Sequence, residues 1–124
     1  MRLSIIIPAL DEEATLASAL TALAPLRADG HEVIVVDGHS SDETFALARS
    51  GADLAFIASR GRAAQMNAGA ARARGDVLLF LHADSRLPAG AARAIGAAIA
   101  GGARWGRFDV TIHGRPRVLR VIAA

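Results

Sequence analysis

His82 and Asp84 stand two residues apart at the end of an apolar run, residues 78–81. A run of this kind is typical of a buried strand, and in extended backbone residues two apart point to the same side. The pattern predicts an imidazole and a carboxylate side by side, which suits a divalent cation with open positions for ligand oxygens. In the alternative interpretation, Asp84 or Ser85 caps a helix and His82 lies at the edge of the core.

Polar side chains also follow three other apolar runs. In an open parallel sheet, ligands bind beyond the carboxyl ends of the strands, so we expect these side chains to share one rim. Pro8, Asp11 and Glu12 follow run 3–7, Asp37, Gly38, Ser40 and Asp42 follow run 33–36, and Arg60 and Arg62 follow run 54–58.

Each rim residue also has an interpretation that needs no ligand. The acidic and serine side chains can cap helices or interact with a helix dipole. Asp37 needs a partner, because a carboxylate at the end of a buried strand loses its hydration. Arg60 and Arg62 can be a solvated helix start. Positive charge there opposes the helix dipole, however, which favours an anionic ligand.

The spacing of apolar residues, with glycine and proline at the boundaries, predicts alternating strands and helices. Pro25 is expected to stop the first helix, and the tail RVLRVIAA, residues 117–124, looks like the opening of an amphipathic helix. The alternation predicts an α/β sandwich with a mainly parallel sheet. Strands are expected over residues 3–8, 31–36, 52–59, 76–84 and 104–114, and helices over 11–26, 41–51, 61–75 and 88–102.

Length and composition indicate the class of protein. The chain has 124 residues, the size of one domain, and none of its apolar runs approaches the roughly 20 residues that span a bilayer. The absence of cysteine favours a cytoplasmic location. All 14 basic residues are arginines, they are dispersed, and the net charge is only +2, so nucleic acid is not an expected partner.

Three segments together resemble the successive motifs of family 2 glycosyltransferases, in order and at matching spacing. They are SIIIPALDEE, VIVVDGHSSDET and GRAAQMNAGAARARGDVLLFLHADSRLP. The resemblance implies the GT-A fold, a Rossmann-like three-layer sandwich. More narrowly, GRAAQMNAGA with HAD and GRFDV is similar to a bacterial subgroup, the selenium-domain-associated or carotenoid-type glycosyltransferases.

The resemblance implies nucleotide-binding roles at the first part of the rim. Pro8, Leu10 and Glu12 are implied at the base and ribose, and Asp37 in nucleoside recognition. Members of the family often carry a second aspartate, which reads the base, where this chain has Gly38. The resemblance therefore leaves the identity of the base open.

The resemblance also implies a diphosphate and metal anchor. Arg60 or Arg62 is implied to support the diphosphate, and Asp84 to bind Mg²⁺ or Mn²⁺ that bridges it. The segment HAD stands where the family has its DxD metal motif, so His82 replaces the first carboxylate and either ligates the metal or hydrogen-bonds a phosphate oxygen. A cation at Asp84 would stabilise negative charge on the departing diphosphate.

The implied function is metal-dependent, inverting transfer of a sugar from a nucleotide donor, expected to be a UDP-sugar, to a glycan, lipid or small-molecule acceptor. Inverting members use a carboxylate base beyond the metal motif. After Asp84 the chain offers only Asp109, inside a predicted strand. We therefore expect residues 1–124 to be the nucleotide-sugar-binding half of a longer transferase, with the base beyond Ala124. The alternative is a non-catalytic nucleotide-sugar-binding module.

Two other nucleotide-binding classes fit the sequence poorly. A dinucleotide-binding oxidoreductase would have GxGxxG after the first strand, where this chain has PALDEEAT. A sugar nucleotidyltransferase would need lysine in a glycine-rich loop, and the chain has none. If the acceptor is a lipid, the arginine-bearing tail RPRVLRVIAA suits an interfacial helix at the inner face of the membrane, with a core helix as the alternative.

Overall fold

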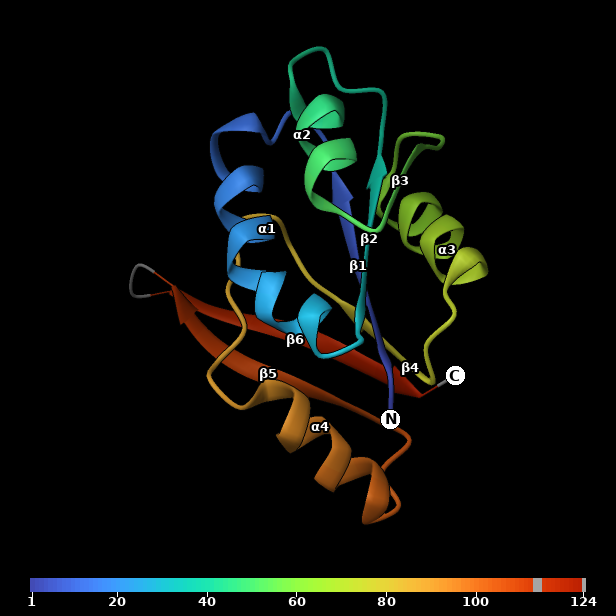
Figure 1. The fold of residues 1–124 in the computed structure, drawn as a ribbon, viewed down its shortest axis with the longest axis vertical. Helices are drawn as coiled ribbons and strands as arrows, with labels where there is room; N and C mark the ends of the chain where they lie inside the picture. The colour runs from blue at the N-terminus through green and yellow to red at the C-terminus, as the bar shows by residue number, and fades with distance from the viewer. Residues whose placement is uncertain (113–114, 124) are drawn as a thin grey trace.

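A mixed sheet of six strands forms the centre of the structure, and helices lie on both of its faces (Figure 1). The computed structural model describes residues 1–112 and 115–123, with side chains described up to residue 106. The elements are β1 (Leu3–Ala9), α1 (Glu13–Ala28), β2 (Glu32–Asp37), α2 (Thr44–Gly51), β3 (Leu54–Ile57), α3 (Arg62–Arg72), β4 (Val77–Phe80), α4 (Ala91–Ala100), β5 (Trp105–Ile112) and β6 (Arg115–Ala123).

The strand order is β3-β2-β1-β4-β6-β5. The first four of these strands are parallel to one another, and β6 runs antiparallel to both β4 and β5. The predicted α/β class with a mainly parallel sheet is confirmed. Parallel strands inside a sheet are covered on both faces, and this explains why the apolar runs are continuous.

Two apolar clusters fill the space above and below the sheet. On one face, Ile5, Ile7, Val33 and Val35 pack with side chains of α1, α2 and α4. On the other face, Ile6, Ile34 and Val36 pack with alanines of α3. Alternate residues of the same strand thus enter different clusters, as the pleat requires, and the result is the expected three-layer sandwich.

The tail is a strand and not the helix that its apolar spacing predicted. Residues 115–123 form β6, which pairs with β4 on one side and with β5 on the other. A position between two strands offers hydrogen bonds along both edges, and that tertiary context overrides a short local pattern. The interpretations of this tail as an interfacial helix or a core helix are both wrong.

The boundaries of two helices also differ from the prediction. Pro25 lies inside α1 and does not stop it. Pro25 and Thr21 are both exposed, so water can reach the Thr21 carbonyl, which has lost its usual amide donor. The fourth helix begins at Ala91 instead of Pro88, after a left-handed Gly90 with φ 76°. Among the described residues, no helix is long and apolar enough to cross a membrane.

Helix α3 approaches the sheet closely at Gly69. A Cβ atom added there would lie 2.5 Å from Cγ2 of Ile6 and 3.1 Å from Cγ2 of Val36. These contacts are below van der Waals distance, and a buried β-branched side chain has little freedom to move away. Glycine at this position therefore sets the distance between α3 and the sheet.

We expect Gly69→Ala to destabilise the protein by about 1 to 2 kcal/mol, because overpacking outweighs the better helix propensity of alanine. Gly96→Ala in α4 is the matched control, since its Cβ would meet only Cε of Met1, at 3.5 Å. The control should be neutral or stabilise by about 0.5 to 1 kcal/mol. Urea unfolding measures both, and equal effects of the two substitutions would contradict this account of α3 packing.

Candidate functional site

The carboxyl ends of β1, β2 and β4 lie at one edge of the sheet. Ala9 pairs with Asp37 at the ends of β1 and β2, and the amide of Leu81, just after β4, donates to the carbonyl of Ile6 at 3.0 Å. The loops that follow these strands therefore leave the sheet at the same edge. We call this edge the rim, and it contains the site residues that the sequence predicted.

The loops after β1 and β2 hold each other through side-chain to backbone hydrogen bonds. The Asp11 amide donates to Oγ of Ser40 at 2.9 Å, and the Ser41 amide donates to Oδ1 of Asp11 at 2.8 Å. The Glu12 amide donates to Oγ1 of Thr44 at 2.8 Å. Asp11 has a φ of 50°, a conformation that aspartate tolerates better than most residues. Asp11 and Ser40 thus connect two loops and do not cap a helix, since the N-cap residues of α1 and α2 are Glu12 and Glu43.

Asp37 is 1% exposed and has found its partner within its own loop. The backbone amide of Ser40 donates to Oδ2 of Asp37 at 2.9 Å, and the Ser40 hydroxyl donates to Oδ1 at 2.5 Å. The sequence predicted that this carboxylate needs a partner, and the structure assigns that place to Ser40. Asp37 therefore orders the loop after β2 in this structure.

Gly38 is buried beneath the start of α3. Its amide donates to the Ala9 carbonyl at 2.9 Å, and its carbonyl accepts from Nε of Arg60 at 3.0 Å. A second nitrogen of Arg60, Nη2, donates to the carbonyl of His39 at 3.0 Å. Arg60 thus connects the segment before α3 to the loop after β2. Gly38 and Arg60, which the sequence predicted as site residues, therefore both lie at the rim.

Gln65 is a rim residue that the sequence did not reveal. Its side chain is 4% exposed, and its carboxamide occupies the space beside Gly38. A Cβ on Gly38 would lie 2.8 Å from Oε1 of Gln65, so there is no room for a side chain at this position. The only available signal was a polar residue among the alanines of a helix, which is usually an exposed position.

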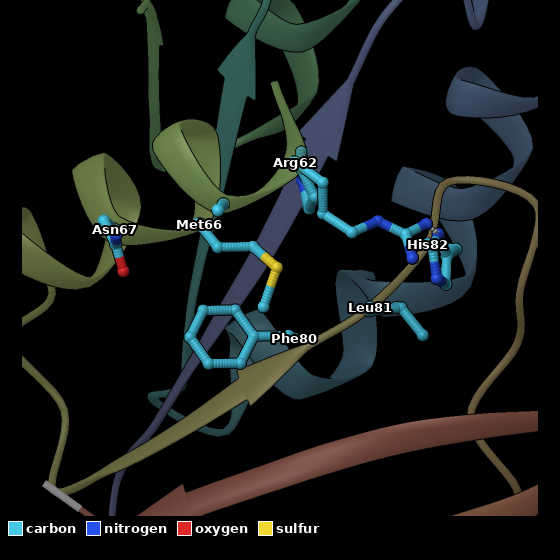
Figure 2. A pocket seen from close by; sticks show the side chains of 8 residues that line it. Arg62, Met66, Asn67, Phe80, Leu81 and His82 are labelled. Carbon is cyan, nitrogen blue, oxygen red and sulfur yellow. Dashed lines mark hydrogen bonds between the residues drawn. The ribbon is translucent and has the colours of Figure 1, made fainter. Parts of the chain in front are cut away.

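His82 interacts with Arg62 across the rim. Nη2 of Arg62 lies 2.6 Å from Nδ1 of His82, and Figure 2 shows the two side chains meeting above Leu81. Arginine can only donate, so Nδ1 accepts, and the proton of a neutral His82 is on Nε2. Residues 81–84 are not the extended strand that was predicted, because β4 ends at Phe80 and a turn forms at Ala83 and Asp84. That turn is what places Asp84 in an exposed position.

Glu12 and Asp84 are close enough to influence each other electrostatically. Burial raises the pKa of the Glu12 carboxyl above its ordinary value of 4.5, and the negative charge of Asp84 raises this pKa further. Asp42 and Asp11 add smaller effects in the same direction, while a hydrogen bond with Thr15 opposes them. The rim therefore places carboxylates in mutual repulsion on its α1 side and two arginines on its α3 side.

A cavity of about 480 Å³ opens between α3 and the end of β4 (Figure 2). Of the predicted residues, it brings together Pro8, Arg62 and His82. The others do not line it, namely Leu10, Glu12, Asp37, Gly38, Arg60 and Asp84. Its remaining walls are largely apolar. They come from Ala63, Met66, Asn67, Phe80 and Leu81.

The residues at Asp84 fit a cation that arrives together with a diphosphate. Among the described residues there is no group of three histidine, aspartate or glutamate side chains that could hold a metal ion. Mg²⁺ is commonly bound through one or two carboxylates and the phosphates of a substrate, with water completing its shell. Asp84, with Glu12 nearby, matches this donor set. His82 fits less well as a ligand, because its Nδ1 is engaged by a cationic guanidinium.

The family model described as glycosyl transferase family 2 matches residues 4–118. No curated protein sequence matches the chain. Among solved structures, S. aureus TarS 1-349 is similar, with a TM-score of 0.76 and 20% identity over 99% of this chain and 47% of that chain. A second structure of TarS 1-349, in complex with UDP-GlcNAc, has the same TM-score and 23% identity over 93% of this chain and 36% of that chain.

Two phosphoglycerate-linked synthases also share the fold. Mannosyl-3-phosphoglycerate synthase from Rubrobacter xylanophilus has a TM-score of 0.70 and 22% identity over 85% of this chain and 38% of its own. Glucosyl-3-phosphoglycerate synthase from Mycobacterium tuberculosis, in complex with Mn²⁺, UDP and glucosyl-3-phosphoglycerate, has a TM-score of 0.59 and 25% identity over 68% of this chain and 35% of its own. The chain thus spans less than half the length of each of these solved structures.

We expect Glu12→Gln to stabilise the protein at pH 7. Because the pKa of Glu12 is raised in the folded state, its ionised form disfavours folding at neutral pH, and that penalty is lost well below the ordinary pKa of 4.5, where the carboxyl is protonated in both states. The midpoint of urea unfolding should rise at pH 7 and stay unchanged well below pH 4.5. Glu43→Gln, at an exposed position near the same loops, is the control. An equal gain from both substitutions, or a gain independent of pH, would refute the local repulsion.

Proposed function

The chain belongs to glycosyl transferase family 2, and on that premise we propose that its rim binds a nucleoside diphosphate sugar as the donor for glycosyl transfer. One observation carries the proposal, namely that Arg62 at the start of α3 lies 2.6 Å from His82 in the loop after β4, while Asp84 of that loop acts electrostatically on Glu12 after β1. Cationic groups suit a diphosphate, and adjacent carboxylates suit the cation that accompanies it. The complex of TarS with UDP-GlcNAc and that of glucosyl-3-phosphoglycerate synthase with UDP support a uridine donor.

We assign the nucleoside to the loops after β1 and β2. Pro8 and Asp37, near the ends of β1 and β2, border this region together with Leu10, Glu12 and Gly38 of the loops that follow. Since Ser40 engages both carboxylate oxygens of Asp37, we infer that Asp37 shapes the loop that receives the base. Because Gly38 has no side chain, we infer that backbone groups and Glu12 recognise the nucleoside.

We assign the diphosphate to Arg60, Arg62 and Asp84. Arg62 already donates to His82, and its guanidinium has further N–H groups to offer a phosphate oxygen. His82, with its proton on Nε2, is a donor to phosphate rather than a metal ligand. Mg²⁺ or Mn²⁺ at Asp84 would supply Lewis-acid stabilisation of the departing diphosphate. The presence of Mn²⁺ in the complex of glucosyl-3-phosphoglycerate synthase supports the use of a divalent cation.

The proposed reaction joins an acceptor hydroxyl oxygen to the anomeric carbon of the sugar and breaks the bond from that carbon to the diphosphate. The acceptor proton leaves to a base, and negative charge grows on the diphosphate, where the guanidinium groups lie. Inversion at the anomeric carbon is part of the proposal and follows the family resemblance. Asp109, the only carboxylate after Asp84, lies in β5, and its side chain is outside the described residues, so no base is assigned.

The remaining predictions from the sequence concern the surroundings of the protein. A glycan, a lipid or a small molecule stays the predicted range of acceptors, and a cytoplasmic location stays a prediction. Contact with a membrane through a helical tail is no longer proposed, since residues 115–123 form β6. The non-catalytic binding module shares the donor site proposed here and differs only in lacking transfer.

We expect Asp84→Asn to weaken UDP binding about tenfold when Mn²⁺ is present and to change it little in EDTA, because the carboxylate acts through the cation. Isothermal titration with UDP, with and without Mn²⁺, measures this. Asp76→Asn is the matched control, as it makes the same charge change at the opposite end of β4, where Asp76 accepts from the Arg2 amide. UDP affinity that is independent of metal and unchanged in Asp84→Asn would reject the metal site. Tighter binding of GDP or dTDP would revise only the base.

A further inference from the structure

The carboxamide of Gln65 is a buried polar group whose hydrogen bonds all lead to the rim. Its Nε2 donates to the Ala9 carbonyl at 3.0 Å and to the Val36 carbonyl at 2.9 Å. Its Oε1 accepts from the Gly61 amide at 3.1 Å. A buried amide is tolerated only when it is bonded in this way, so the position of Gln65 is fixed by three partners.

These partners belong to three different elements at the ligand edge. Ala9 is the last residue of β1, Val36 is near the end of β2, and Gly61 is the N-cap of α3. Gly61 has a φ of 135°, a conformation that other residues rarely adopt, so the chain turns sharply into the helix here. One side chain thus connects the start of α3 to the strand ends that carry the nucleoside loops.

The start of α3 is also where the two rim arginines lie. Arg60 and Arg62 flank Gly61, and the hydrogen bond from Gly61 to Gln65 fixes the backbone between them. Their guanidinium groups reach in different directions, Arg60 to the carbonyl of Gly38 and Arg62 to His82. A shift of α3 along the sheet would therefore move both cations relative to the Asp84 side of the rim.

From this geometry we propose that Gln65 is a positioning residue for the donor diphosphate, acting through Arg60 and Arg62. This inference rests on the proposed function of the rim, because it assigns to Gln65 the placement of the two arginines that would bind the diphosphate. The carboxamide of Gln65 hydrogen-bonds to backbone groups, and it leaves no room for a side chain at Gly38. Loss of the carboxamide removes one donor from each of the Ala9 and Val36 carbonyls, although the Ala9 carbonyl still accepts from the Gly38 amide. It also removes the acceptor of the Gly61 amide at the N-cap of α3.

The test compares UDP affinity in Gln65→Met with that of a variant of similar stability. Methionine keeps the length and most of the volume of glutamine but has no amide, so UDP should bind about tenfold more weakly in the presence of Mn²⁺. Leu20→Ala is the control, because Leu20 packs in the cluster on the α1 face. It should lower the thermal midpoint and leave UDP affinity unchanged. Equal affinity in Gln65→Met and the parent protein would overturn the proposal.

A double-mutant cycle separates positioning from general weakening of the fold. If Gln65 acts through the arginines, Gln65→Met should have a much smaller effect on UDP affinity when Arg62→Gln is already present. Effects that multiply independently would contradict a role through Arg62. If Gln65→Met does not fold, Gln65→Asn serves instead, because it keeps the amide but withdraws it by one methylene from the Ala9 and Val36 carbonyls.

A measurement without nucleotide keeps this inference distinct from the proposed function. The ¹⁵N chemical shifts of the His82 ring report whether Nδ1 accepts a hydrogen bond, and Gln65→Met should shift them toward a ring released by Arg62, whereas Leu20→Ala should not. A shifted signal with no UDP binding in the parent protein would reject the donor site and the role toward the diphosphate, and would keep only the placement of Arg62 by Gln65. UDP binding with an unshifted signal and unchanged affinity would reject the positioning role and keep the donor site.

Discussion

β1 is hydrogen-bonded to parallel strands along both edges and covered by side chains on both faces, and the rest of the structure depends on this central position. Its isoleucines alternate between the two clusters, so a shift of one residue would exchange every contact at once. That strict register also fixes the height at which the neighbouring strands end. The loops after β1, β2 and β4 meet at one edge for this reason.

The rim illustrates the compromise between stability and ligand binding. The lost hydration of Asp37 is compensated, because both of its carboxylate oxygens accept hydrogen bonds from Ser40. In the same way, Oδ1 of Asp11 accepts from the amide of Ser41 in the neighbouring loop. Glu12 is different, since burial and the charge of Asp84 both disfavour its ionised form. Repulsion of this kind is usual where a protein holds charges in place for a ligand to neutralise. The same carboxylates would become favourable neighbours once a cation lay between them.

The sequence predicted what depends on local pattern and missed what depends on partners far along the chain. Continuous apolar runs identified the parallel strands, and the polar residues after them identified the rim, because both follow from burial on two faces. The tail became a strand only because β4 and β5 offer it hydrogen bonds. Gln65 resembled an exposed helical residue, and the acceptor role of His82 depends on Arg62, twenty positions earlier. No local spacing contains that information.

The order of strands in the antiparallel part has a consequence for synthesis on the ribosome. β6 lies between β4 and β5 in the sheet, although β5 precedes it in the chain. The edge of β4 therefore stays unpaired while residues 81–114 emerge, and β5 has no partner until β6 follows. Exposed strand edges invite pairing with other nascent chains. Between the synthesis of Phe80 and that of Ala123, β4 and then β5 therefore present edges at which pairing with another chain could occur.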